Sequence, residues 1–160
     1  MSTAITLRTV SLVLLPTIAL FGANGSCFAQ DQAAGVKAAI DAYHQAIESR
    51  DLSKLEPLWA HDDNVFVVNP ADKTISIGWD SVRKSWESTF DAIAEVKITQ
   101  TDGPHVRTND NMAWSTGMVT ADVKFKSGDT RSAPTLETDV FEKSGGKWLL
   151  VSHVASRVPK

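Results

Sequence analysis

The sequence predicts an α+β fold in which three N-terminal helices pack on one face of a strongly curved antiparallel β-sheet. Apolar residues recur at helical spacing in the first half of the chain, and from Val96 onward they alternate with polar residues in runs separated by turn signals. Helices followed by a meander of long strands are typical of a two-layer packing. Because a sheet that curves around helices leaves a cavity wherever they do not fill it, the fold predicts a pocket.

The first 29 residues are predicted to be a secretory signal peptide. Arg8 is their only charge, and Val10–Phe21 is almost continuously apolar. This run of about a dozen residues is too short for a stable membrane span but typical of an export signal. Cys27 and Ala29 are small residues of a cleavage site, so we expect cleavage after Ala29 and a periplasmic or secreted protein. Lipidation of Cys27 is the alternative, which Asn24 disfavours because a leucine is expected there.

Residues 30–160 are predicted to form one domain. They number 131 of the 160 residues and include no cysteine, since Cys27 is the only one in the chain. A structural disulfide, a thiol nucleophile and a cysteine-based zinc site are therefore excluded, and a chain of this length can bury a core without them. Loss of Arg8 changes the net charge from −3 to −4, which argues against nucleic-acid binding.

An amphipathic helix is predicted over Gln32–Ser49. Its apolar residues share one side of the helix and would pack on the sheet. These residues are Val36, Ile40, Tyr43 and Ile47.

A second, short helix is expected to start after Asp51, whose carboxylate can cap its N-terminus. Pro57 falls in its first turns and keeps it short. Its apolar residues are Leu52, Leu55, Leu58 and Trp59.

Two short strands come next. The segment Val65–Val68 is brief and rich in β-branched residues, so it is predicted to be a buried strand that ends at Asn69-Pro70. A second short strand is expected at Thr74–Ile77.

A third helix is predicted after Gly78, which turns the chain. Asp80 or Ser81 can cap its N-terminus through a side-chain oxygen. Its apolar face comprises Trp79, Val82, Trp86 and Phe90.

Longer β-rich runs complete the chain. They are expected at Val96–Thr101, Met112–Phe125, Arg131–Glu142 and Trp148–Ser156. Turn signals lie at Asp102-Gly103-Pro104, Asn109-Asp110-Asn111, Ser127-Gly128-Asp129 and Ser144-Gly145-Gly146.

Two segments carry a family resemblance. The segment Tyr43–Trp59, which contains Arg50-Asp51-Leu52, resembles the opening of ketosteroid isomerase and SnoaL-like proteins of the nuclear transport factor two-like (NTF2-like) superfamily. In Glu137–Ser156 a Glu-Thr pair precedes a Gly-Lys-Trp-Leu hairpin and a final strand. This run is similar to the end of SnoaL-like domains and of the association domain of calmodulin-dependent kinases. With Gly78-Trp79, the resemblance covers nearly the whole mature chain.

The resemblance implies a cone-shaped, cystatin-like α+β roll. It places a conical pocket between the first helix, the third helix and the concave face of the sheet, and it implies a homodimer formed through the convex face. It does not select a function, because the superfamily includes isomerases, cyclases, dehydratases, assembly subunits and proteins that only bind a ligand.

Tyr43 and Asn69 occupy positions that carry catalysis in the isomerases that the chain resembles. There, a tyrosine of the first helix donates a hydrogen bond to the developing oxyanion, and Tyr43 matches it, although burial on an apolar helix face explains Tyr43 equally well. The general base in those enzymes is an aspartate directly before the proline that ends the first strand. Here Asn69 takes that place, and an amide cannot accept a proton near neutral pH. A neighbouring carboxylate, Asp72 or Asp63, could substitute for that base, but both lie in turn-like contexts, where aspartate usually binds the backbone.

Glu137 and Asp139 fall on one face of a predicted strand. On the concave face they would form an acidic pair in the pocket, with a raised pKa and an acid or base role. On the convex face they would be solvent or interface charges. Phe141 lies on the same face as Glu137 and Asp139, so the alternation of polar and apolar residues does not show which face of the strand is concave. We favour the outward orientation because unpaired charges are seldom buried. If they face inward, Asp139 is a candidate catalytic residue and Glu137 a candidate ligand contact.

His153 is the histidine best placed for a catalytic role, since the final strand of SnoaL-like relatives often carries an inward histidine. In those relatives the histidines lie one place to either side, so a bond to a backbone carbonyl at the sheet rim is the alternative. No pair among His44, His61, His105 and His153 has an HxH or HxxxH spacing. We therefore predict no metal site and no cofactor.

Aromatic residues could form a wall for a flat or apolar ligand. The alternative is that they fill the cone and leave no cavity. The predicted ligand contacts are Trp59, Phe66, Asn69, Trp79, Trp86, Trp114 and Glu137.

The sequence thus supports a small-molecule binding domain without a complete isomerase catalytic pair. A second possibility is an isomerase, dehydratase or cyclase acting on an enolisable or polycyclic molecule, with Tyr43 as donor and His153, Asp139 or Glu137 as base. The third is a dimerising assembly or inhibitory module. The missing aspartate before Pro70 favours the first. We expect a small-molecule ligand and a homodimer, with no nucleic-acid partner and no membrane association after signal cleavage.

Overall fold

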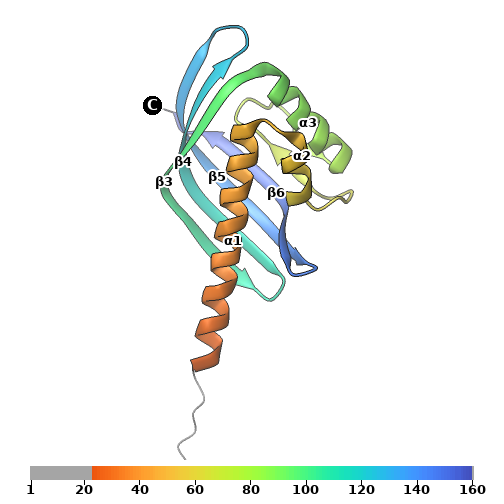
Figure 1. Cartoon of the computed structure of the whole chain (residues 1–160), viewed down its shortest axis with the longest axis vertical. Helices are drawn as coiled ribbons and strands as arrows, with labels where there is room; N and C mark the ends of the chain where they lie inside the picture. Colours follow the sequence, from red (N-terminus) through yellow and green to blue (C-terminus); the bar gives the residue numbers. More distant parts are fainter. Residues whose placement is uncertain (1–22, 160) are drawn as a thin grey trace, which may run out of the picture.

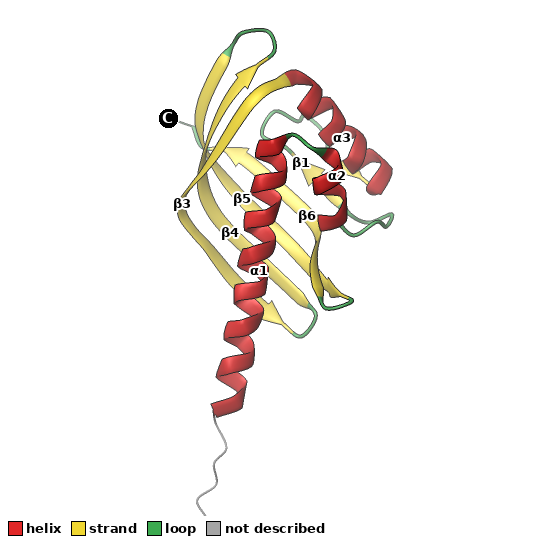
Figure 2. Cartoon of the chain, viewed as in Figure 1, coloured by secondary structure: helices red, strands yellow, loops and turns green. Residues whose placement is uncertain are grey.

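The computed structural model describes residues 23–159, with side chains from Gln30 onward. It confirms the predicted α+β architecture, in which helices lie on the concave face of one strongly curved sheet (Figure 1; Figure 2). The first 22 residues of the predicted signal peptide lie outside the described residues, and the rest of it is described as helix backbone.

Helix α1 (Ala23–Ser49) contains the predicted helix and extends it towards the N-terminus. It crosses the concave face of the sheet (Figure 1), and the predicted apolar side is buried there: Val36, Ile40, Tyr43 and Ile47. Over residues 23–159, no helix combines the length and apolar composition that a membrane crossing requires.

Helix α2 (Leu52–Leu55) and the 3₁₀ helix η1 (Glu56–Leu58) form the predicted short helical segment. The Asp51 carboxylate caps it as expected, accepting the Ser53 backbone N–H at 3.0 Å. Pro57 lies in the first turn of η1. The segment inserts Leu55 and Trp59 into the core.

Strands β1 (Phe66–Val68) and β2 (Ser76–Ile77) precede helix α3 (Trp79–Ala92). The predicted side-chain cap of α3 by Asp80 or Ser81 is wrong. Gly78 is the N-cap residue, and its backbone φ of 80° suits a glycine. The Trp79 N–H donates to the Asp62 carbonyl at 3.0 Å, so the helix begins earlier than the side-chain signals indicate.

The long strands are β3 (Ile93–Asn109), β4 (Met112–Phe125), β5 (Thr130–Ser144) and β6 (Lys147–Arg157). The sheet order is β2-β1-β6-β5-β4-β3, and all pairs are antiparallel except β1 with β6. The expected turn at Asp102-Gly103-Pro104 is wrong, because β3 continues through it with register shifts between Gln100 and His105. Such irregularities bend a strand without ending it.

A β-bulge in β6 sets which side chains face the cone. Phe141 pairs with Leu150, whereas Val140 pairs with Ser152, so Val151 is an extra residue in β6. Because side chains alternate between faces, one extra residue reverses the faces of all that follow it. His153 consequently shares the concave face with Leu150.

Candidate functional site

The strand registers arrange the concave side chains in layers. Asp139 of β5 lies opposite His153 of β6 and Ser115 of β4. One alternation further along β5, Glu137 lies opposite Ala155, and beyond it Thr135 lies opposite Arg157. Each strand therefore contributes one side chain to each layer, which brings residues far apart in sequence into contact.

Asp139 and His153 form a hydrogen-bonded pair that is almost sealed from solvent. The His153 Nδ1–H donates to Asp139 Oδ1 at 2.7 Å, and the Ser115 hydroxyl donates to Oδ2 at 3.4 Å. The two residues are only 2% and 3% exposed. Burial by itself would lower the pKa of His153. The hydrogen bond to Asp139 and the charges of Asp139 and Glu137 outweigh it and raise that pKa above its ordinary value.

Glu137 forms a second carboxylate–histidine pair, which links the sheet to α1. The His44 Nε2–H donates to Glu137 Oε2 at 2.9 Å. Burial opposes ionisation of Glu137, but the hydrogen bond from His44 and the charges of His153 and His44 prevail, so its pKa is lowered. The favoured outward orientation of Glu137 and Asp139 is therefore wrong: both are buried on the concave face. Each carboxylate is buried with a histidine partner. The argument for an outward orientation, that unpaired charges are seldom buried, therefore does not apply to them.

Tyr43 packs beside these pairs at the closed end of the cone. Its ring centroid lies 5.1 Å from that of His153, 5.8 Å from Trp86 and 6.2 Å from Trp59. Burial, followed by the charges of Asp139 and Glu137, raises the pKa of Tyr43 well above its ordinary value, so the phenol stays neutral and can donate. These aromatic rings fill the part of the cone around Tyr43. The alternative in which they fill the whole cone and leave no cavity therefore holds only for this part.

Three polar atoms in this aromatic cluster are buried without a hydrogen-bond partner among the described residues. They are the Tyr43 hydroxyl, Trp59 Nε1 and Trp86 Nε1. A buried polar group left unpaired costs roughly 1–3 kcal/mol. The Tyr43 hydroxyl and the two neighbouring indole N–H groups are therefore an unusual concentration of unsatisfied polar atoms in the described core.

A cavity of about 150 Å³ opens on the concave side, beyond the layer of Glu137. The buried Asn69 and Thr135 supply polar groups at its inner end. The Asn69 side-chain amide donates to Ser85 Oγ at 3.2 Å, and its backbone N–H donates to Asp72 Oδ2 at 2.8 Å. Exposed residues, among them Arg131, form the mouth. The apolar walls are Ile93, Ala121, Val123, Phe125 and Ala133.

Three of the predicted ligand contacts lie outside the cone. Trp114 is 49% exposed on the convex face, because the inward residues of β4 are its neighbours Ala113 and Ser115. Phe66 also points outward, since the adjacent Val67 pairs with His153 on the inside, and Phe66 lines an outer depression of about 360 Å³.

Trp79 is the third misplaced contact. It is half-buried at the start of α3 and stacks on His61, with ring centroids 4.0 Å apart. A spacing of seven residues places Trp79 and Trp86 on the same side of a regular helix. Trp79 is the first residue of α3, where the chain turns away from the cone, so its side chain does not follow that of Trp86.

The structure brings together six of the other predicted residues, namely Tyr43, Trp59, Trp86, Glu137, Asp139 and His153. The seventh, Asn69, is buried apart from them in the lining of the cavity. Two partners were not predicted. Ser115 shares strand parity with the small residues Ala113 and Gly117, which could have indicated the concave face. His44 follows Tyr43 on the helix, and only the curvature of the sheet brings it to Glu137. Across the side chains that the structure describes, no three potential ligands converge as a metal site.

We predict that the free energy of unfolding falls as the pH rises above neutral. Folding raises the pKa of His153 above the ordinary 6.5, so its contribution to stability is complete below that value and is lost as the pH rises through the folded pKa. The contribution of Glu137 to stability is present at neutral pH and is lost only in the acid range, because folding lowers its pKa. Urea unfolding at about pH 6 and about pH 9 measures the difference.

The matched variants are His153→Asn, which keeps an N–H near Asp139 but cannot ionise, and His105→Asn on the exposed surface. The first should reduce the pH dependence and the second should preserve it. Equal slopes in both variants would contradict the assignment.

Comparisons with known proteins support the fold and the family. A model of the SnoaL-like domain matches residues 36–160. No curated protein is similar enough to be matched.

Among solved structures, one similar protein is provisionally described as a dehydratase of the NTF2-like family from Streptomyces avermitilis. It is 22% identical, with a TM-score of 0.74 over 82% of this chain and 99% of that one. A ketosteroid isomerase-like protein from Erwinia carotovora atroseptica is 19% identical, with a TM-score of 0.69 over 81% and 98% of the two chains.

A third similar structure is provisionally described as a calcium/calmodulin-dependent protein kinase II association domain from Xanthomonas campestris. It is 23% identical, with a TM-score of 0.67 over 78% of this chain and 86% of that one. At these identities the three likenesses establish a shared fold. The match of the family model, which spans most of the sequence, shows that this chain belongs to the SnoaL-like domain family.

Proposed function

We propose that this protein binds a small, mainly apolar or aromatic molecule in the concave cavity beside α3. The observation that carries the proposal is the cavity itself, which combines apolar walls with the buried polar residues Asn69 and Thr135 at its inner end. An apolar pocket with a few convergent polar groups is the usual form of a small-molecule site. SnoaL-like and NTF2-like domains commonly bind small molecules or act as isomerases or dehydratases.

The size of the cavity limits the ligand. Its volume of about 150 Å³ equals that of an apolar cavity which holds one benzene molecule, and drug-sized ligands occupy roughly 300–1,000 Å³. We therefore propose a ligand with a single ring or a short chain in the cavity, in place of the polycyclic molecule considered from the sequence.

The extent of the cavity favours binding over catalysis, because the cavity ends before it reaches the Asp139–His153 pair. Its lining includes Asn69 and Thr135 but neither Asp139 nor His153. The Glu137 layer lies between Thr135 and Asp139. At the inner end of this cavity a ligand contacts an amide and a hydroxyl, which hold a ligand but do not exchange protons with it near neutral pH. The carboxylate of the lining, Asp72, already accepts the backbone N–H of Asn69.

We predict that Ala133→Phe abolishes binding, because the added ring occupies the space of the ligand. Titration with benzamide, followed by tryptophan fluorescence, should show an affinity at least about tenfold weaker than that of the parent. Ser132→Phe is the matched control, since it adds the same ring to the adjacent, outward position of β5. Unchanged affinity in Ala133→Phe would rule out this cavity as the site.

A second candidate function is proton-transfer catalysis, and the Asp139–His153 pair favours it. Asp139 holds Nδ1 of the imidazole at 2.7 Å, which leaves Nε2 as the nitrogen that can exchange a proton with a substrate. Tyr43, with its neutral phenol beside the imidazole, would supply a hydrogen-bond donor. This pair would provide the acid or base that Asn69 cannot.

If this second function holds, a cyclic enolisable ketone such as cyclohexenone should exchange its α-protons for deuterium in the presence of the protein. His153→Gln should slow the catalysed exchange by at least about 100-fold, the usual contribution of a general acid or base. NMR measures the rate, with His105→Asn as the control. Exchange no faster than in buffer would exclude the enzyme for this ketone class.

We also propose a homodimer formed through the convex face of the sheet. On that face Trp114 lies opposite Val140 and Met118 opposite Leu136, and these two apolar pairs form a stripe with the pair Thr116–Thr138 between them. Trp114 and Leu136 are among the most exposed large apolar residues in the described part of the chain. Exposed apolar residues gathered on one face are typical of a protein interface.

The proposed dimer should dissociate when Leu136→Glu places a charge in the stripe. Light scattering coupled to size exclusion should then report the monomer mass, whereas Ile75→Glu, a substitution of an exposed isoleucine in the loop before β2, should leave the dimer intact. A parent protein that is monomeric at every concentration would refute the interface.

Export is the last part of the proposal, with residues 1–29 as the signal and residues 30–160 as the SnoaL-like domain. Support comes from the core: the first described residue that is fully buried is Val36, beyond the expected cut after Ala29. Removal of residues 1–29 would therefore leave the core intact. Mass spectrometry of the periplasmic fraction of a bacterial host should give a chain beginning at Gln30; an intact Met1 or a lipidated Cys27 would contradict this cut.

A further inference from the structure

We infer that the ligand of the concave cavity is a small carboxylate, whose ring or chain enters the cavity while its carboxylate remains at the mouth. The inference rests on the proposed binding function, because it requires a ligand in that cavity. The observations that point to a carboxylate are the positions and the unpaired charges of Arg131 and Arg157.

Both arginines line the cavity on the concave face of the sheet, and both are exposed. Arg157 of β6 pairs with Thr135 of β5, and Arg131 lies two alternations before Thr135, so all three share one face. The apolar Ala133 lies between Arg131 and Thr135. A ring held against the walls would thus place a substituent of its outer edge beside the two guanidinium groups.

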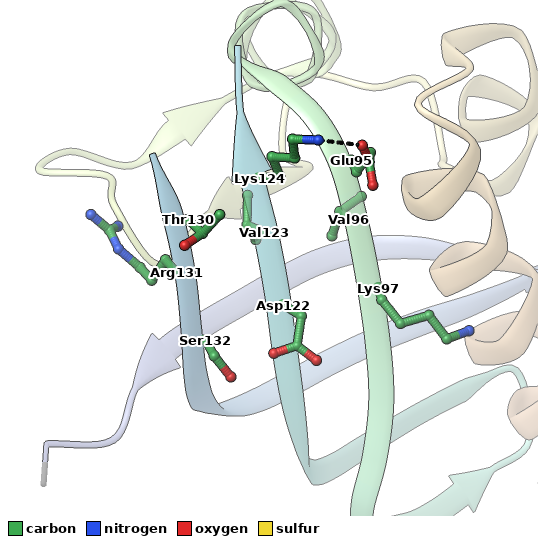
Figure 3. A pocket seen from close by; sticks show the side chains of 9 residues that line it. All are labelled: Glu95, Val96, Lys97, Asp122, Val123, Lys124, Thr130, Arg131 and Ser132. Carbon is green, nitrogen blue, oxygen red and sulfur yellow. Dashed lines mark hydrogen bonds and ion pairs between the residues drawn. The ribbon is translucent and has the colours of Figure 1, made fainter. Parts of the chain in front are cut away.

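Neither guanidinium makes an ion pair with a carboxylate of the described residues. The lysines nearby differ in this respect, because Lys124 pairs with Glu95 at 2.9 Å and Lys97 with Glu48 at 3.1 Å. Arg131 also lines a polar depression on β3, β4 and β5 that contains the Glu95–Lys124 pair, and Figure 3 shows its side chain directed away from that pair. The charge of Arg131 is thus not neutralised by the described charges of that depression.

Arg131 is also positioned by an aromatic side chain. Its guanidinium carbon lies 5.5 Å from the ring centroid of Phe125, which is itself part of the cavity wall. A cation–π contact of this kind restrains the side chain without using its N–H donors. The donors remain free to bind an anion at the mouth.

The mouth is positive although the chain carries a net charge of −3. Asp72 is the only carboxylate among the lining residues, against two guanidinium groups. Asp72 Oδ2 already accepts the backbone N–H of Asn69 at 2.8 Å. Guanidinium groups bind carboxylates through parallel N–H···O bonds, so the arrangement selects a monocarboxylate with a single ring or a short chain.

The test compares benzoate with benzamide, which has the same shape and no charge, by isothermal titration calorimetry. Benzoate should bind the parent about tenfold more tightly, the difference expected for a charge-assisted contact. The double variant Arg131→Gln/Arg157→Gln should lose this preference, so that it binds benzoate and benzamide about equally. The control is Lys97→Gln/Lys124→Gln, which removes the same number of charges outside the cavity and should retain the preference.

Each contrary result has a distinct meaning. Equal affinities of the parent for benzoate and benzamide would overturn the carboxylate inference and leave the binding function standing, provided that Ala133→Phe abolishes both. Equal losses in the arginine and lysine variants would also overturn it, since a general electrostatic field would then explain the preference. Absence of binding of both compounds to the parent would overturn the proposed function and this inference together.

Discussion

The extra residue in β6, Val151, is the constraint on which the rest of the site depends. If the pairing of Phe141 with Leu150 continued without it, Asp139 would face Ser152, and His153 would point to the convex side. The bulge shifts the register by one residue and turns His153 and Arg157 towards the cone. Strand β1 joins β6 immediately after it, at Ser152–Val154. One local irregularity thereby places the histidine, the cavity mouth and a neighbouring strand.

The buried charges of the site are organised as two carboxylate–histidine pairs. Asp139 bonds His153 within the sheet, and Glu137 bonds His44 of α1. Removing one member of a buried pair typically costs about 3–5 kcal/mol, because the other charge is left without compensation. The pairs therefore hold α1 and the sheet in a defined relation, and they keep acidic groups in a part of the molecule where water has little access.

Much of the fold followed from local patterns in the sequence. The apolar face of α1, the Asp51 cap and the hairpin turn at Ser144-Gly145-Gly146 depend on residues close in the chain, and each is present in the structure. The orientation of Glu137 and Asp139 did not follow, because it depends on histidines supplied by α1 and β6. The outward positions of Phe66 and Trp114 were also missed, since aromatic character does not reveal which face of a strand a residue occupies.

The place of β6 in the sheet has a consequence for the order of folding. Strand β6 is C-terminal in sequence, yet it lies between β1 and β5 in the sheet. Until its residues leave the ribosome, the β1–β2 pair cannot join the rest of the sheet, and Asp139 has no imidazole partner. Contacts between segments so distant in sequence form slowly, since the intervening chain must first be closed into a loop. The cone can therefore close only after β6 has been synthesised, and until then the part of α1 that packs on β6 remains uncovered or shielded by other molecules.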